Sequence, residues 1–128
     1  MLRASFDGLD SAMQPFEFKA PSESVWDDIE KKGVESSTYK LYEAQAHAQC
    51  AVAGTTTGRL IFYKEGGQDL DFSVTLTPER ENEILEAAKL FWEHVVTNTP
   101  PEPDPERDWY IPESGDQQFK WDAYADAW

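Results

Sequence analysis

A proline run that begins at residue 100 limits how far this chain can extend as a compact domain. The run Pro-Pro-Glu-Pro-Asp-Pro at residues 100–105 cannot continue a helix and predicts a stiff, extended linker. We therefore divide the chain of 128 residues into a core, residues 1–99, and a Pro-rich acidic linker with an aromatic tail, residues 100–128. The second part contains eight acidic and two basic residues, so a large excess of acid also remains in the core.

The composition excludes several classes of protein. A formal net charge of −14 argues against simple, surface-wide binding of nucleic acid, which usually needs a basic surface. A single cysteine, Cys50, excludes a disulfide framework, a four-cysteine zinc site and a cysteine-held iron–sulfur cluster. No apolar run approaches the roughly 18–20 residues of a membrane span, and the N-terminus lacks a signal-peptide core. We expect a soluble, cytoplasmic protein without a membrane partner.

Short alternating and β-rich segments predict four strands in the core. Residues 4–7 and 16–19 are expected to form two strands joined by a turn, with the two Phe rings of the second strand on one face. Residues 59–63 and 70–76 are expected to form a hairpin that turns at Gly66-Gly67. Together with the helices described next, these strands predict a small α/β domain.

Capping residues predict three helices. The first begins at Ser22 or Ser24 and ends at Gly33, and a longer helix covers residues 38–53. The last helix begins at Thr77, with proline at its first position. Its apolar face consists of Ile84, Ala87, Ala88, Phe91, Trp92 and Val95.

Three charged residues suggest a metal-dependent reaction. Asp7 and Glu17 fall on neighbouring predicted strands, where two carboxylates can converge on a divalent cation such as Mg²⁺. Lys19 projects from the same strand face as Glu17, so its ammonium can lie beside an attacking water or a scissile phosphate. The alternative is an ordinary acidic strand with a solvated Glu–Lys face.

A polar row on the helix of residues 38–53 is the second candidate feature. Tyr42, Gln45 and Gln49 have the spacing i, i+3, i+7 and therefore share one face. They suit contacts to phosphate or water beside a metal site. The alternative, favoured without further observations, is that these three side chains are solvated and the opposite side is buried, formed by Ala44, Ala48, Ala51 and Val52.

These segments together resemble one enzyme family. The runs Ser-Phe-Asp-Gly-Leu-Asp at residues 5–10, Phe-Glu-Phe-Lys-Ala-Pro at 16–21 and Tyr-x-x-Gln-x-x-x-Gln at 42–49 resemble the lambda-exonuclease (YqaJ-type viral recombinase) branch of the PD-(D/E)XK nucleases. The resemblance covers residues 3–99. It implies a restriction-endonuclease-like core, with a central mixed sheet flanked by helices.

The resemblance also implies a role for each candidate residue. Mg²⁺, with Mn²⁺ as the alternative ion, would be held by Asp7, Glu17 and the backbone carbonyl of Phe18. Lys19 would orient or help to deprotonate the attacking water. The helix would position the water or the scissile phosphate through Tyr42 and Gln45, supported by Gln49.

The implied activity is a Mg²⁺-dependent exonuclease that digests linear double-stranded DNA from its 5′ ends. Members of the family act in phage or prophage recombination in bacterial cytoplasm, often as ring-shaped homo-oligomers, and leave 3′ single strands for an annealing protein. They also carry an N-terminal helical region before the Asp-Gly motif. Because Asp7 stands so early here, we expect that the chain is a fragment or internally started product, or that a partner supplies those helices.

Two rival hypotheses remain open. The chain can be an inactive truncated remnant, or a protein-interaction module that keeps the nuclease fold, or it can be a PD-(D/E)XK nuclease of restriction or repair. The aromatic row Trp121, Tyr124 and Trp128 suits either docking onto another chain or packing on its own core. The remaining candidates are interpreted as ordinary helix or core residues: His47, His94 and Cys50.

Overall fold

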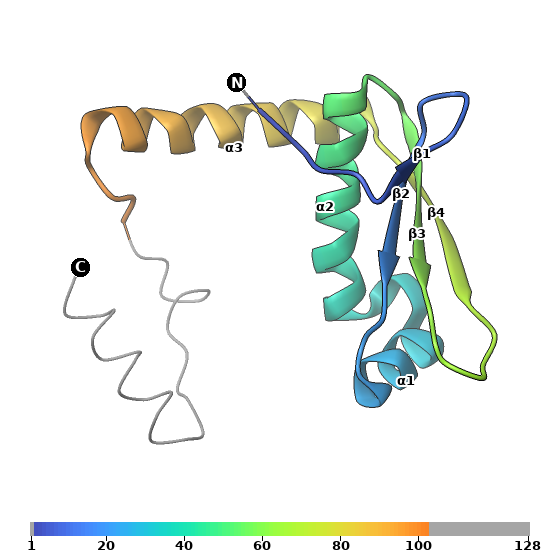
Figure 1. Cartoon of the computed structure of the whole chain (residues 1–128). Coiled ribbons are helices and arrows are strands. Elements are labelled where there is room, and N and C mark those ends of the chain that lie inside the picture. Colours follow the sequence, from blue (N-terminus) through green and yellow to red (C-terminus); the bar gives the residue numbers. More distant parts are fainter. Residues whose placement is uncertain (1, 103–128) are drawn as a thin grey trace, which may run out of the picture. The chain divides into compact units, whose positions relative to one another are not determined.

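The computed structural model describes residues 2–102 and confirms an α/β fold (Figure 1). Residue contacts divide the chain into two compact units, Met1–Glu86 and Ala87–Trp128. The tail residues Trp121, Tyr124 and Trp128 lie outside the described residues. The elements in chain order are β1 (Gly8–Leu9), β2 (Pro15–Lys19), α1 (Glu23–Lys32), the 3₁₀ turn η1 (Gly33–Glu35), α2 (Ser37–Ala53), β3 (Thr57–Phe62), β4 (Leu70–Thr75) and α3 (Pro78–Thr97).

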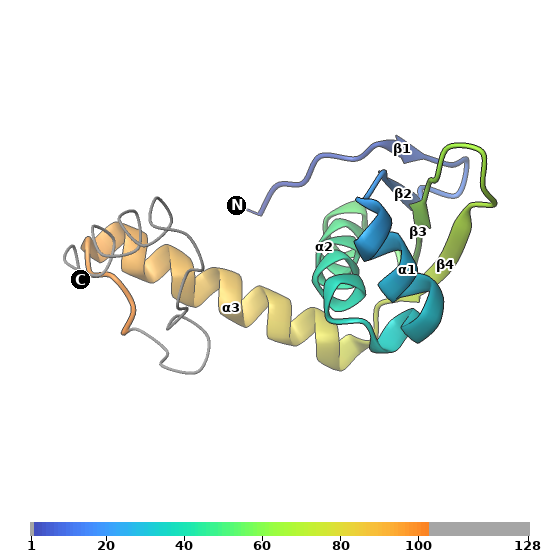
Figure 2. The same cartoon turned by 90° about the horizontal axis from the view of Figure 1, so that it is seen from below.

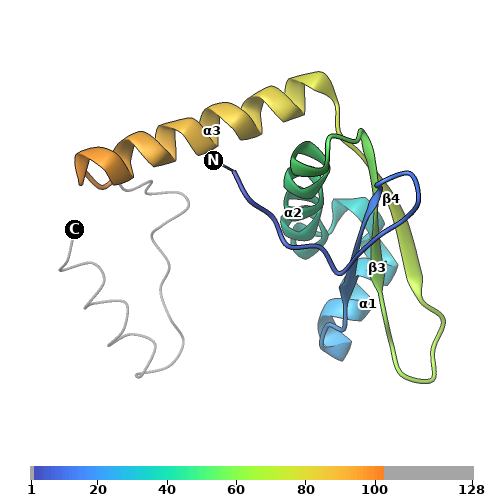
Figure 3. The same cartoon turned by 45° about the horizontal axis from the view of Figure 1, so that its top comes forward.

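The strands form one mixed sheet in the order β1-β2-β3-β4. β1 pairs with β2 and β3 pairs with β4 in antiparallel fashion, whereas β2 and β3 are parallel. A parallel pair needs a crossover connection, and here it contains α1 and α2. Both helices lie on the same side of the sheet (Figure 2). The predicted hairpin of β3 and β4 is present and turns through Gly66, whose φ is +69° (Figure 3).

The helix boundaries follow local signals in the sequence. Ser36 precedes α2, and its side-chain oxygen accepts a hydrogen bond from the Tyr39 amide, which satisfies one free donor of the first turn. Gly54 ends α2 in the left-handed conformation, with φ of +73°. Thr77 caps α3 by accepting a hydrogen bond from the Arg80 amide. The predicted helix starts are therefore confirmed to within a residue or two.

The core lies between α2 and the sheet. Tyr39 of α2 packs against Phe62 and Phe72, with ring centroids 6.4 Å and 4.8 Å away. Gly58 on β3 faces Cys50 of α2 so closely that a Cβ there would lie 2.9 Å from the Cys50 Sγ atom. This contact brings α2 near enough for its polar row to reach β2. Cys50 is buried, as predicted for a small core residue.

One expected strand at the start of the core is absent, and the last predicted helix is present but exposed. Residues 4–7 are not a strand; β1 is Gly8–Leu9, because the Asp7 side chain rather than its backbone takes the next amide of β2, that of Phe18. In α3 the predicted helix exists, but it buries no residue, and its apolar face is exposed. Within residues 2–102 there is no helix long and apolar enough to cross a membrane.

Candidate active site

The Glu17 carboxylate is the centre of a buried polar cluster. Its residue is only 5% exposed, and three side chains donate hydrogen bonds to it. The Lys19 ammonium and the Gln45 amide reach Oε1 at 2.7 Å and 2.9 Å. The Gln49 amide reaches Oε2 at 2.7 Å. The cluster therefore joins β2 to two successive turns of α2.

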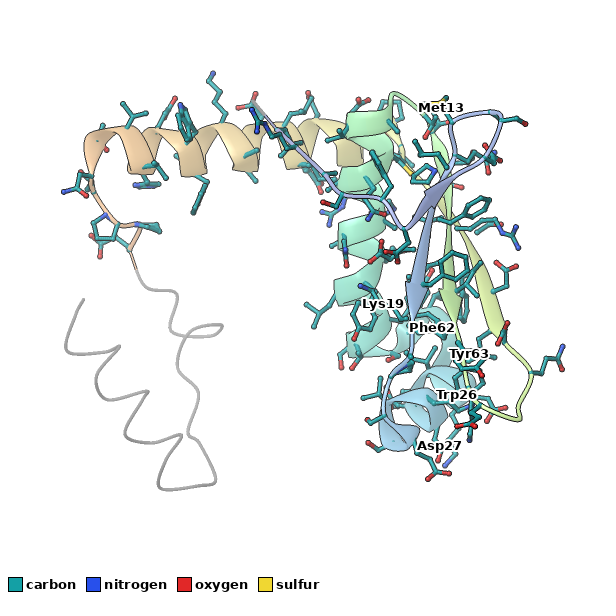
Figure 4. The ribbon with its side chains drawn as sticks, in the orientation of Figure 1. Met13, Lys19, Trp26, Asp27, Phe62 and Tyr63 are labelled. Carbon is teal, nitrogen blue, oxygen red and sulfur yellow. The ribbon has the colours of Figure 1, made fainter. Side chains whose placement is uncertain are left out.

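The alternation of β2 explains why Glu17 and Lys19 lie on the helix side of the sheet. Side chains of a strand point alternately to opposite faces, and Glu17 pairs with the buried Leu60 of β3. Phe18, one residue further, points to the other face and is more than half exposed. Figure 4 marks Lys19 on β2 beside α2. The Lys19 Nζ atom lies 5.0 Å from the centre of the Tyr42 ring, so the ammonium is held between a carboxylate and an aromatic face.

Asp7 meets the cluster from the edge of the sheet. Its Oδ2 atom accepts a hydrogen bond of 2.8 Å from the Phe18 amide, although the side chain is exposed. Within a strand the amide and carbonyl of one residue point to the same edge. The Phe18 carbonyl therefore faces the edge where Asp7 lies. The two carboxylates and this carbonyl come from directly adjacent backbone.

Gln49 has the most constrained side chain of the cluster. It is 2% exposed, and its amide nitrogen donates to the Ser5 carbonyl at 2.9 Å as well as to Glu17. These two acceptors fix which end of the amide is nitrogen. Its Oε1 atom is then buried without a hydrogen-bond partner among the described residues. A buried amide oxygen in this position requires a donor or a cation.

The structure decides between the two interpretations of the polar row on α2. Gln49 is buried and Tyr42 is half-buried, whereas Gln45 is exposed but still bonds Glu17. The favoured alternative, three solvated side chains, is therefore wrong. The buried side of α2 is also not the predicted alanine face, because the residues that are buried are Tyr39, Ala46, His47, Gln49 and Cys50.

Electrostatically, one carboxylate balances one ammonium inside the cluster. Removing either charge would leave the other buried without its partner, which is costly in a medium of low dielectric constant. Burial also acts on two other ionisable side chains of α2. It raises the pKa of the Tyr39 phenol to about 12 and raises the pKa of the Cys50 thiol, so neither group ionises near neutral pH.

The metal-binding capacity of the site rests on few side chains. Across the part of the chain that the structure describes, no group of three or more acidic, histidine or cysteine residues is placed to hold an ion. Asp7 and Glu17 supply two carboxylates, and the Phe18 carbonyl supplies a third hard oxygen. Mg²⁺ often takes one or two protein carboxylates and keeps several waters. The donor set and the unpartnered Gln49 oxygen therefore fit such an ion chemically.

His47 is a buried residue that connects three segments of the fold. It is buried, and its Nε2 atom lies 3.1 Å from the Thr75 carbonyl. Its Nδ1 atom is 3.5 Å from the Nε atom of Arg80, so the imidazole links α2 to the end of β4 and the start of α3. Its partners are 28 and 33 residues away, and no local pattern indicated them.

Neither a protein-family model, nor a curated protein, nor a solved structure matches this chain.

Proposed function

We propose that this chain carries the catalytic residues of a PD-(D/E)XK-type nuclease and acts as a Mg²⁺-dependent exonuclease on linear double-stranded DNA. The supporting observation is that Lys19, Gln45 and Gln49 all donate to the Glu17 carboxylate. Asp7 contacts the same strand one residue further on, through the Phe18 amide. The mixed sheet, with β2 and β3 parallel and a helical crossover, is compatible with the restriction-endonuclease-like core of this class. By the same resemblance, digestion runs 5′ to 3′ in phage or prophage recombination.

In this proposal the ion is held by Asp7, Glu17 and the Phe18 carbonyl. When bound, Mg²⁺ supplies positive charge against the phosphate and acidifies water; Mn²⁺ would serve as well. Asp7 has a carboxylate oxygen other than the one that accepts from Phe18. Glu17 uses both oxygens in hydrogen bonds, but a carboxylate oxygen accepts about two, and Oε2 accepts only one from the described residues.

In this proposal the Lys19 ammonium stabilises the negative charge that develops on the phosphate. Its Nζ atom donates to Glu17 and lies over the Tyr42 ring, so its position is defined before substrate binds. Preorganised charge stabilises a developing phosphate charge without reorganisation. Gln45, exposed beside Lys19 on the same carboxylate oxygen, offers an amide that can turn toward a water or a phosphate oxygen.

The chain's acidity limits how it can bind DNA. A net charge of −14 repels the phosphate backbone, and a bound ion offsets only part of that charge. We therefore expect weak DNA binding by the chain alone. Additional basic surface would come from a partner, and the 3′ single strand produced would pass to an annealing protein.

The decisive experiment compares three chains on linear double-stranded DNA with Mg²⁺: wild type, Glu17→Gln and Lys19→Ala. We expect the wild type to resect 5′ ends and both variants to be slower by about 10²–10³-fold, the usual cost of losing one electrostatic contact to the transition state. Lys40→Ala is the matched control, because Lys40 is an exposed lysine of the same helical region whose one salt bridge among the described residues is with Glu35. Equal rates in all four chains, or digestion in the presence of a chelator, would contradict the assignment.

One observation favours a second candidate, an inactive remnant or interaction module with the nuclease fold. Both oxygens of Glu17 already accept hydrogen bonds from protein donors, and a carboxylate held in this way can serve stability alone. Mn²⁺ titration followed by NMR distinguishes the two hypotheses. Selective broadening of the Asp7, Glu17 and Phe18 signals supports the nuclease, whereas unselective broadening over the acidic surface supports the remnant.

A further inference from the structure

The most prominent feature outside the candidate site is an apolar stripe along α3. Phe91, Trp92 and Val96 are 65%, 60% and 67% exposed. With about 100° between successive residues, they lie on one side of the helix. We define the α3 stripe as the residues on that side, namely Ile84, Leu85, Ala88, Phe91, Trp92, Val95 and Val96.

The apolar residues of the α3 stripe are spaced as in helices that pair in a coiled coil. Leu85, Ala88, Trp92 and Val95 follow one another at intervals of three, four and three residues, which is the a/d pattern of a coiled-coil seam. The opposite side of the helix is mainly charged, and its exposed apolar residue is Leu90. A helix with this pattern needs a second apolar surface of similar width to cover it.

The exposed area is enough for a small interface. An aromatic side chain carries about 150–250 Å², so Phe91 and Trp92 together present about 250 Å² at the exposures given above. The aliphatic members bring the stripe to about 500 Å² per chain, and two copies would bury about 1,000 Å², the lower limit for a specific interface. An apolar patch of this size on a protein surface is often functional.

We infer that the α3 stripe binds the α3 stripe of a second copy of this chain, in an antiparallel pair with two-fold symmetry. The same surface then serves both partners. Lys89 lies at the edge of the a/d seam, whereas Glu93 falls behind it, so the apolar contact carries the association. This closed dimer differs from the ring implied by the family resemblance, and it does not depend on the proposed nuclease activity.

The charge of the chain gives the dimer a distinctive salt dependence. Each copy has a net charge of −14, so two copies repel each other at low ionic strength. Salt screens that repulsion but leaves the apolar contact intact. We expect the dimer to become tighter as salt increases, opposite to an association held mainly by ion pairs.

The test measures the mass of the full chain by sedimentation from about 5 to 200 µM, a range that brackets weak specific association. Three chains are compared: wild type, Trp92→Glu and, as a matched control, Leu90→Glu on the opposite side of the same helix. Wild type and Leu90→Glu should form dimers with rising concentration. Trp92→Glu should raise the dissociation constant by at least about 30-fold, as expected for an aromatic hot spot. Because neither position is buried, all three chains should keep the same circular dichroism.

Several outcomes would overturn the dimer. They are a monomeric wild type at every concentration, assemblies larger than two, or equal dimerisation by the Trp92→Glu chain. A fourth is a monomeric wild type that dimerises only after Trp121, Tyr124 and Trp128 are replaced by Ala. That result would assign the α3 stripe to the chain's own tail instead.

Discussion

The two long helices, α2 and α3, differ in which kind of side chain they bury and which they expose. α2 buries polar residues, including His47 and Gln49, whereas α3 exposes large apolar residues, including Phe91 and Trp92. Both depart from the usual rule that apolar side chains are buried and polar ones exposed. Such departures tend to fall where a protein binds or reacts.

The physical reason differs between the two helices. On α2 the buried donors find acceptors inside the chain: the Gln49 amide nitrogen donates to Glu17, and the His47 ring bonds the Thr75 carbonyl. Hydrogen bonding makes burial of these groups tolerable. On α3 nothing in the described residues buries the apolar stripe, so the hydrophobic gain is still available to a partner. The first helix indicates a site within the chain, and the second an interface between chains.

Core truncation on α2 is the largest effect that this comparison predicts. Tyr39→Ala removes a fully buried ring that packs on Phe62 and Phe72. It should lower the free energy of unfolding by about 3–5 kcal/mol. Trp92→Ala on α3 should change it by less than about 0.5 kcal/mol, when urea unfolding is measured at a concentration where the chain is monomeric. A loss of similar size at both positions would mean that the α3 stripe is buried within one chain.

The polar row of α2 gives an intermediate effect. Gln49→Leu keeps the side-chain volume similar but removes the one donor among the described residues that reaches Oε2 of Glu17. Since hydrogen bonds to charged groups contribute about 1.5–3 kcal/mol, the free energy of unfolding should fall by that amount. Gln45→Leu is the matched control. Gln45 is exposed and shares Oε1 with Lys19, so its loss should cost less.

Equal losses for the two variants would show that burial does not distinguish the two glutamines. A stabilised Gln49→Leu chain would show instead that the unpartnered Oε1 atom costs more than the Glu17 contact contributes. The second result would also show that no donor satisfies that oxygen in the metal-free chain.

Local signals in the sequence predicted most of the fold. Glycines at the helix ends, Thr77-Pro78 and the Gly66-Gly67 turn act through neighbouring backbone, so they can be interpreted from the sequence alone. The strand over residues 4–7 failed because pairing there is decided eleven residues away, where Asp7 accepts from Phe18. Short strands of this kind depend on their partner rather than on their own propensity.

The candidate site was predictable in its membership but not in its burial. Spacing placed Tyr42, Gln45 and Gln49 on one helix face, but it did not show that this face meets the sheet. Three alanines on α2 competed as the buried side, and the long-range contact between Gln49 and Glu17 decided the outcome. For α3 the apolar face was predicted correctly, but periodicity carries no information about what covers it.

The smallest effect concerns how each helix is anchored at its start. Ser36, the buried cap of α2, donates a hydrogen bond of 2.7 Å to Asp28, whereas the cap of α3, Thr77, is exposed. Lys32 and then Ser36 lower the pKa of the Asp28 carboxyl below its ordinary value of 3.8. A carboxyl whose pKa is lower in the folded state stabilises above its unfolded pKa. This contribution is lost as the pH falls through the folded pKa.

Asp28→Asn keeps an oxygen for Ser36 but removes the charge, so it isolates this contribution. The free energy of unfolding of wild type should exceed that of Asp28→Asn at neutral pH, and the difference should shrink as the pH falls below about 4. The control is Asp27→Asn, because Asp27 is an exposed neighbour whose contact with Lys64 spans 3.9 Å. A difference that stays constant from pH 7 to pH 3 would mean that the Asp28 charge does not anchor α2. The start of α2 would then depend on its neutral hydrogen bonds, such as the one between Ser36 and the Tyr39 amide.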